Sequence, residues 1–185
     1  MIKTVISIAL RLMIICLVAA GALAYVNGIT APQVAASKAQ AELDALSVIN
    51  QAGTIGEKVE GDGAGVNYYF PVSDNGTVTN YILSLKSQGY GGDLIILANF
   101  KANGEIIDAK LMEDAETPGL GKKAEESWYM NKFKGTGAST PVPVKKTMLA
   151  AADADVISGA TITFTGVSKA LEYGSDFAKK LGGQQ

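Results

Sequence analysis

The 185-residue chain contains no histidine and only one cysteine, Cys16. Without histidine, a Ser-His-Asp triad and a histidine-bearing metal site are both excluded. Cys16 lies inside an apolar run, so the remainder of the chain has neither a cysteine nucleophile nor a disulfide framework. If the protein takes part in demanding chemistry, a cofactor has to carry most of it.

Positive charge is also scarce, because 16 Lys and Arg residues stand against 18 Asp and Glu residues, for a net charge of −2. Binding to phosphate backbones needs a basic surface, so nucleic acid is excluded as the main partner. Apolar residues make up 48% of the chain and charged residues 18%, which favours a packed core over disorder. The length predicts one soluble domain plus an attachment.

The attachment is predicted at the N-terminus, where residues 12–29 carry no charge and follow Lys3 and Arg11. As a helix this run nearly spans a hydrocarbon core of roughly 30 Å. Basic residues before the run and none soon after it predict a cytoplasmic N-terminus, with the bulk of the chain outside the cytoplasm. Residues 1–29 are therefore interpreted as a single-pass anchor in the inner or plasma membrane. The alternative is a signal peptide cleaved after Ala22-Leu23-Ala24.

A second helix is predicted to follow the anchor. Residues 30–33, Thr-Ala-Pro-Gln, match a capping box with proline near a helix start. The segment 30–65 is then a stalk helix that ends in a linker, because residues 52–65 are rich in glycine and polar residues. This continuation favours retention of the N-terminal helix over its cleavage.

Residues 66–185 are predicted to form the extracytoplasmic domain, of class α+β, with an antiparallel sheet packed against helices. Asn75-Gly76 between two β-type runs is a strong hairpin signal. Apolar periodicity predicts a final helix over 162–181, and composition predicts a short helix over 122–132. The segment 145–152 is predicted to be a strand or extended. The predicted strands span 66–72, 77–86, 93–101 and 105–112.

Two short motifs have ordinary structural interpretations when each is taken alone. Residues 155–161, Asp-Val-Ile-Ser-Gly-Ala-Thr, precede the final helix, where Ser and Thr are common N-caps. Residues 116–121, Glu-Thr-Pro-Gly-Leu-Gly, suit a turn with proline followed by glycine. A helix N-terminus also stabilises phosphate, however, and a threonine hydroxyl there could be esterified to the phosphate of a cofactor.

Together the two motifs resemble the FMN-binding domain family, with its patterns D-x-x-[ST]-G-A-[ST] and E-T-P-G-L-G. In that family a separate flavin transferase, which uses FAD, joins FMN through a phosphoester bond to the last hydroxyl residue of the first pattern. The resemblance implies that Thr161, rather than Thr163, carries FMN. A third stretch, Gln88-Gly-Tyr-Gly-Gly, resembles the family's G-Y-G-G segment. The further cofactor-binding residues implied are Tyr90, Glu116, Thr117, Leu120, Gly121, Asp155, Ser158, Gly159 and Ala160.

The order of anchor, stalk and motifs resembles the G-subunit family of the Rnf complex, a ferredoxin:NAD⁺ oxidoreductase that moves sodium ions or protons. This resemblance implies that the chain is an electron carrier with covalent FMN and without catalytic residues or a metal of its own. The implied partners are other membrane and peripheral subunits, including a second flavin-bearing membrane subunit. The alternatives are the C-subunit family of the Na⁺-translocating NADH:quinone reductase, and a stand-alone membrane-anchored flavoprotein reductase.

One stretch departs from the family pattern. Many relatives carry a histidine shortly before E-T-P-G-L-G, where residues 112–115 of this chain are Met-Glu-Asp-Ala. A role for that histidine in proton exchange with the flavin therefore cannot be transferred to this chain. The departure does not affect the residues implied in attachment.

Overall fold

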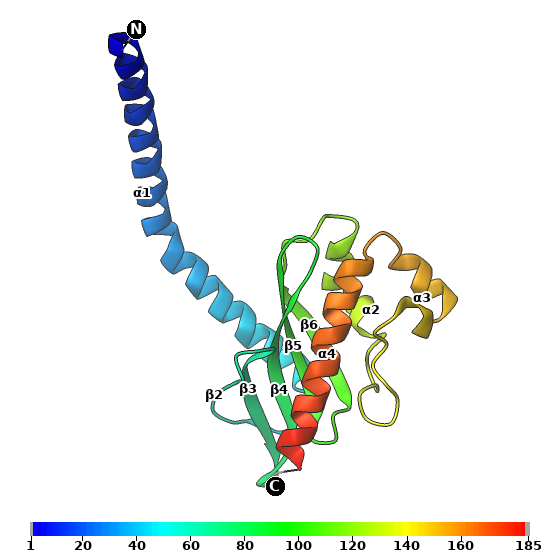
Figure 1. Cartoon of the computed structure of the whole chain (residues 1–185). Helices are drawn as coiled ribbons and strands as arrows, with labels where there is room; N and C mark the ends of the chain where they lie inside the picture. The colour runs from blue at the N-terminus through cyan, green and yellow to red at the C-terminus, as the bar shows by residue number, and fades with distance from the viewer. Residues whose placement is uncertain (1, 184–185) are drawn as a thin grey trace. The chain divides into compact units, whose positions relative to one another are not determined.

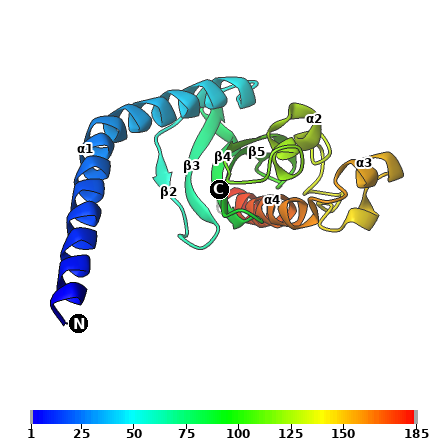
Figure 2. The same ribbon diagram turned by 90° about the horizontal axis from the view of Figure 1, so that it is seen from above.

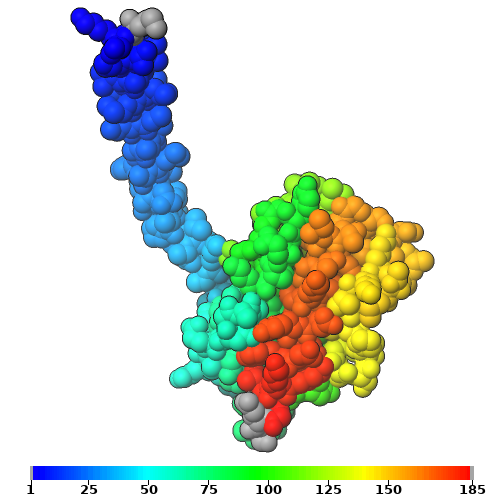
Figure 3. Space-filling model, in the orientation of Figure 1, coloured from blue at the N-terminus to red at the C-terminus, as the bar shows by residue number. Residues whose placement is uncertain are grey.

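The computed structural model describes residues 2–183 (Figure 1). Contacts between Cα atoms divide the chain into two compact units, Met1–Glu42 and Leu43–Gln185. The first unit is helical, and the second contains the sheet and all remaining elements. Figure 3 shows the C-terminal helix, in orange and red, forming part of the exposed surface of the second unit.

Helix α1 spans Ile2–Ile49 without interruption, so the predicted start of a second helix at Thr30 is wrong. The Thr30 hydroxyl donates to the carbonyl of Val26 at 3.0 Å inside the helix instead of capping a new one. Pro32 lies within α1 and, lacking an N–H, bends a helix without having to end it when good helix formers continue beyond it. Figure 2 shows the ribbon of α1 bending part-way along its length.

Within the described residues, α1 is the one helix long and apolar enough to cross a membrane. Its large apolar side chains, such as Ile8, Leu12 and Leu17, are exposed in the chain by itself. A continuous apolar surface of this kind is stable in lipid and unstable in water. These properties fit the predicted membrane anchor.

The sheet is antiparallel in order β1-β3-β4-β5-β6, and β2 also pairs with β3. The four predicted strands and the α+β class are confirmed. The segment 52–65, predicted as linker alone, also contributes two short strands to the sheet. Positive φ at both Asn75 (50°) and Gly76 (83°) gives the β3–β4 hairpin its tight turn. The strands are β1 Thr54–Ile55, β2 Val59–Glu60, β3 Val66–Asp74, β4 Thr77–Gln88, β5 Asp93–Lys101 and β6 Ile106–Glu113.

Beyond the sheet, the predicted helix over 122–132 is two short pieces, because Glu126 adopts an extended backbone (φ −76°, ψ 135°) between them. The segment 145–152 is not a strand: it holds a 3₁₀ turn and the start of a helix, where alanines follow an extended Ala150. The final helix is confirmed. These elements are η1 Gly121–Glu125, α2 Ser127–Met130, η2 Lys146–Met148, α3 Ala151–Val156 and α4 Thr161–Gly182.

The sheet has an apolar core on each face. On one face α4 packs across β4 and β5, and the stacked rings of Phe133 and Phe164 (centroids 5.9 Å apart) join the α2 region to α4. On the other face the last turn of α1 packs on the strands, and the Asn99 amide donates to the Ile49 carbonyl at 2.9 Å. The buried residues of this second core are Ala45, Leu46, Ile49, Phe70, Val72, Ile82 and Leu97.

The loop before β3 is organised by one carboxylate, that of Asp62. Its Oδ1 accepts the N–H groups of Ala64, Gly65 and Val66 at 3.0–3.1 Å, and its Oδ2 accepts the hydroxyl of Tyr173 on α4. Burial raises the pKa of Asp62, but these hydrogen bonds, that of Tyr173 first, outweigh burial and hold the pKa at about 2. The carboxylate thus ties the loop to α4.

We expect Asp62→Ala to lower the melting temperature of the full chain at pH 7 by about 3 °C or more. Because the folded pKa lies below the unfolded value of about 3.9, this stabilisation is present above that value and declines as pH falls toward 2. Thermal melts at pH 7, 4 and 3 should therefore show a shrinking gap between variant and wild type. Tyr173→Phe removes only one of the four hydrogen bonds that Asp62 accepts, so it should lower the melting temperature by less. An equal gap at pH 7 and pH 3 would contradict this account.

Candidate functional site

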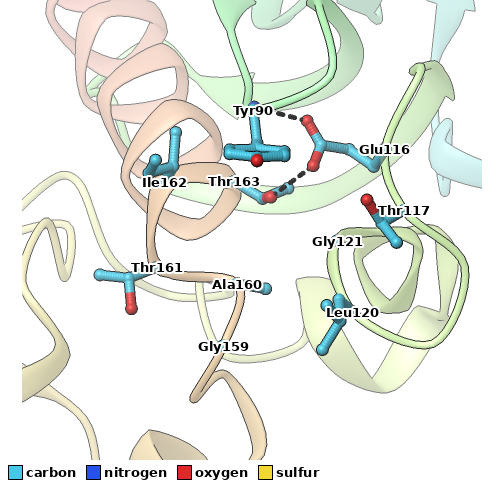
Figure 4. Close-up of a pocket in the computed structure, with 10 residues that line it drawn as sticks. All are labelled: Tyr90, Glu116, Thr117, Leu120, Gly121, Gly159, Ala160, Thr161, Ile162 and Thr163. Atoms are coloured by element: carbon cyan, nitrogen blue, oxygen red, sulfur yellow. Dashed lines mark hydrogen bonds between the residues drawn. The ribbon is translucent and has the colours of Figure 1, made fainter.

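A cavity of about 450 Å³ opens where three segments meet (Figure 4). They are the loop before β5, the loop after β6 and the N-terminus of α4. Every predicted site residue except Asp155 and Ser158 lines this cavity. The lining consists of Tyr90, Glu116, Thr117, Leu120, Gly121, Gly159, Ala160, Thr161, Ile162 and Thr163.

Asp155 and Ser158 instead shape the turn between α3 and α4. The Ser158 N–H donates to the Asp155 carbonyl at 3.1 Å, and the Ser158 hydroxyl donates to the Ala154 carbonyl at 3.4 Å. The same hydroxyl oxygen accepts the Lys146 ammonium. The two residues are thus placed to order the segment that leads to Thr161, and neither lines the cavity.

Helix α4 begins without a side-chain cap, although the sequence there is rich in Ser and Thr. Its N-cap residue is Ala160, whose carbonyl accepts the Phe164 N–H at 3.0 Å. The ordinary interpretation of the motif, in which Ser or Thr caps this helix, therefore does not hold. The first N–H groups of an uncapped helix lack helical partners and carry its partial positive charge. This end of α4 forms one wall of the cavity.

The threonine hydroxyls in the first turns of α4 differ sharply in what they bind. Thr163 is 1% exposed and donates to Oε2 of Glu116 at 2.7 Å, while Thr165 donates to the Thr161 carbonyl at 2.8 Å. The Thr161 side chain is exposed, and its hydroxyl makes no hydrogen bond within residues 2–183. Figure 4 shows that hydroxyl at the edge of the cavity, pointing away from Glu116. Of these three threonines, Thr161 is thus the one with an uncommitted hydroxyl.

Glu116 lies at the junction of the three segments and is 4% exposed. Its Oε1 accepts the N–H groups of Tyr90 and Gly91 at 2.7 and 3.1 Å, and its Oε2 accepts the Thr163 hydroxyl (Figure 4). Its own N–H donates to Oδ1 of Asp114 at 2.8 Å. Sequence reasoning expected a cofactor contact at Glu116 and placed Thr163 in the early helix without a role. Because the two lie 47 residues apart, no local pattern signals their pairing.

Apolar side chains form the rim of the cavity. Tyr90, Leu120 and Ile162 line it and remain 71%, 43% and 55% exposed. Exposed apolar groups gathered at the mouth of a cavity are typical of a site for a flat, partly apolar ligand. The apolar rim would contact the faces of such a ligand, and the polar groups of the cavity would bind its edges.

Further ionisable groups lie in and beside the loop after β6. Burial raises the pKa of Asp114, and hydrogen bonding with Glu125 adds to that effect. The Lys122 ammonium is 2.7 Å from Glu125 and 3.8 Å from Asp114. Burial, followed by the negative charge of Glu116, raises the pKa of the Tyr129 hydroxyl, which has no hydrogen-bond partner in the described part of the chain. Tyr129 is therefore neutral at physiological pH.

Comparison with known proteins finds two family models along the chain. The FMN-binding domain model matches residues 89–175, which include every residue lining the cavity. The model of the RnfG N-terminal region matches residues 1–49. By these two matched regions the chain is similar to the G-subunit family of the Rnf complex.

Relatives of this family align over most of the chain. The G subunit of the proton-translocating ferredoxin:NAD⁺ oxidoreductase complex of Clostridium ljungdahlii is 28% identical over 92% of this chain and 89% of its own. The G subunit of the ion-translocating oxidoreductase complex of Methanosarcina acetivorans is 28% identical over 95% of both chains. A crystal structure of the C subunit of Na⁺-translocating NADH-quinone reductase from Parabacteroides distasonis shares 32% identity and a TM-score of 0.49, covering 68% of this chain and 73% of that one.

The residues of the cavity fit FMN. Its volume and apolar rim suit a flat ring system, and the uncapped start of α4 suits a phosphate. The Thr161 hydroxyl lies next to that helix start. Of the ten lining residues only Glu116 is charged, and its oxygens are occupied by three donors from the protein itself.

Proposed function

We propose that the chain is the flavin-carrying electron-transfer subunit of an ion-translocating ferredoxin:NAD⁺ oxidoreductase complex, with FMN joined through a phosphoester bond to Thr161. The observation that carries this proposal is the uncommitted Thr161 hydroxyl at the edge of an apolar-rimmed cavity, beside an uncapped helix N-terminus. The match to the FMN-binding domain supports FMN as the cofactor, and the complexes to which the relatives belong support the choice of complex.

Each part of the site has a task in this proposal. Thr161 holds the phosphate by its oxygen, and the first N–H groups of α4 stabilise the remaining negative charge. Tyr90, Leu120 and Ile162 contact the ring faces and exclude water from them. FMN supplies one-electron transfer when bound, while the protein orients it and tunes its environment. Asp155 and Ser158 keep the segment before Thr161 in the conformation that presents its hydroxyl.

The proposal also places the chain in the cell. Helix α1 anchors it in the inner or plasma membrane, with the N-terminus in the cytoplasm and the FMN-binding domain on the extracytoplasmic side. Other membrane and peripheral Rnf subunits, one of them a second flavin-bearing membrane protein, are its electron-transfer partners. A separate flavin transferase that uses FAD attaches the cofactor. The boundaries at residues 29 and 65 stay predictions, and the compact unit that holds the cavity begins at Leu43.

The test is an intact-mass measurement on the full chain purified from a host that produces the flavin transferase. We expect the mass of the chain plus one FMN phosphoester, with the adduct mapping to the peptide that contains Thr161. Subunits that co-purify from native membranes identify the complex and separate an Rnf assembly from an NADH:quinone reductase. An unmodified mass in that host would contradict covalent attachment, and purification without other subunits would favour a stand-alone reductase.

A further inference from the structure

We propose that Glu116 is a positioning residue that assembles the cavity before any ligand is bound and places a negative charge in its wall. The proposal deepens the proposed function, because it concerns the same cavity, but its structural part holds whether or not FMN is the ligand. The name Glu116 latch is used below for the carboxylate with its three donors, Tyr90, Gly91 and Thr163.

The latch joins three segments that lie far apart in the sequence. Its two oxygens bind backbone N–H groups from the loop before β5 and a side chain from the first turn of α4, at sequence separations of 25 to 47 residues. The loop around Tyr90 has bend conformation, with Tyr90 itself largely exposed. The exposed Tyr90 ring therefore depends for its position on its backbone, which these hydrogen bonds hold together with the close packing of Gly91 on Ala115.

Two neighbouring glycines leave space for this carboxylate because they have no Cβ. A Cβ at Gly89 would overlap Oε1 of Glu116, and a Cβ at Gly121 would overlap Oε2 while lying 2.8 Å from the Thr163 hydroxyl oxygen. The carboxylate thus lies between the backbones of Gly89 and Gly121, and both of its oxygens accept hydrogen bonds from the protein. A residue packed in this way organises the wall of a site and is not free to reorient toward a ligand.

The charge of the latch has its own consequence for a redox ligand. Glu116 is the only charged residue among those lining the cavity, and little water reaches it. Adding an electron to a ring system beside a fixed negative charge is less favourable than adding it beside a neutral group. Glu116 therefore lowers the reduction potential of a flavin held in the cavity.

The structural part is tested by hydrogen–deuterium exchange on the full chain in the Thr161→Val background, so that no covalent flavin is present. In Glu116→Ala we expect the peptide covering Tyr90 and Gly91 to exchange at least about 100-fold faster, while β5 peptides keep their protection. Glu116→Gln keeps one carbonyl oxygen for the two N–H groups and should stay within about tenfold of the Glu116 chain. Glu126→Ala, which removes an exposed carboxylate from the same region, should match the Glu116 chain.

Unchanged exchange at Tyr90 and Gly91 in Glu116→Ala would overturn the latch, and so would equal acceleration in Glu126→Ala. A uniform loss of protection throughout the chain would show general destabilisation, which also overturns a role specific to this cavity. These readouts need no flavin, so they remain decisive if the proposed cofactor is wrong.

The charge is tested by redox titration of the FMN-loaded chain, comparing Glu116→Gln with wild type. At an ambient potential equal to the wild-type midpoint, we expect the ratio of reduced to oxidised flavin to rise about tenfold in the variant. Thr163→Val removes one hydrogen bond but no charge and should leave the ratio within about threefold. A ratio unchanged in Glu116→Gln, or raised equally in Thr163→Val, would overturn the electrostatic role.

Discussion

Replacing Thr161 with valine is expected to abolish covalently bound flavin while the domain stays folded. Valine has the shape of threonine without its hydroxyl, so no oxygen remains to form the phosphoester. The side chain is exposed and its hydroxyl makes no hydrogen bond in the described residues, so the free energy of unfolding should change by about 0.5 kcal/mol or less. In-gel flavin fluorescence and intact mass measure the loss, and a thermal melt checks the fold.

Neighbouring hydroxyls provide the controls for this experiment. Thr165→Val removes a hydroxyl that already binds within the protein, and this variant should keep the flavin. Thr161→Ser restores a hydroxyl at the same position and should restore the adduct, in keeping with the [ST] ending of the family motif. Fluorescence that persists in Thr161→Val would show that another residue carries the ester.

The second large effect is expected at Gly121, where a single methyl group should disrupt the cavity. A Cβ there would overlap Oε2 of Glu116 and lie 2.8 Å from the Glu116 Cβ and from the Thr163 hydroxyl oxygen. All these groups are buried, so overpacking combines with the loss of a buried hydrogen bond. We expect Gly121→Ala to cost about 2–4 kcal/mol of unfolding free energy. Denaturant melts measure this cost, and intact mass should show reduced flavin attachment.

Gly119 offers a matched comparison two residues away in the same loop. A Cβ at Gly119 would meet nothing within 4 Å, but the residue has a φ of +78°. Gly119→Ala should therefore cost only the backbone strain, about 1 kcal/mol. If the two variants lose equal stability, steric conflict with the carboxylate is not the reason that Gly121 is a glycine.

The sequence predicted the parts of the fold that carry local signals. Asn75-Gly76 marked the hairpin, and alternating or continuous apolar runs marked β3 to β6 and α4. The two-residue strands β1 and β2 were missed because no periodicity can be seen in two residues. They exist because the edge of β3 supplies hydrogen-bond partners, which is a tertiary effect.

Local signals also misled at two places. Thr30 begins a pattern typical of a capping box, yet α1 continues through it into the good helix formers that follow Pro32. The hydroxyls of the last motif suggested a capped helix, yet Ala160 is the N-cap and Thr161 is left uncommitted. In the site, the resemblance pointed to the three segments that line the cavity. The junction at Glu116 could not be predicted, because pairing with Thr163 depends on the packing of α4 against the loop after β6.

The last turn of α1 determines where a water-soluble form of the domain has to begin. Residues Ala45, Leu46 and Ile49 cover one face of the sheet, and the Ile49 carbonyl receives the amide of Asn99. A truncation at the glycine-rich segment would leave Phe70, Val72, Ile82 and Leu97 facing water, and such an apolar surface promotes aggregation. A truncation that removes the anchor should therefore be made before Leu43, so that the remaining fragment keeps the helical turn that closes its second core.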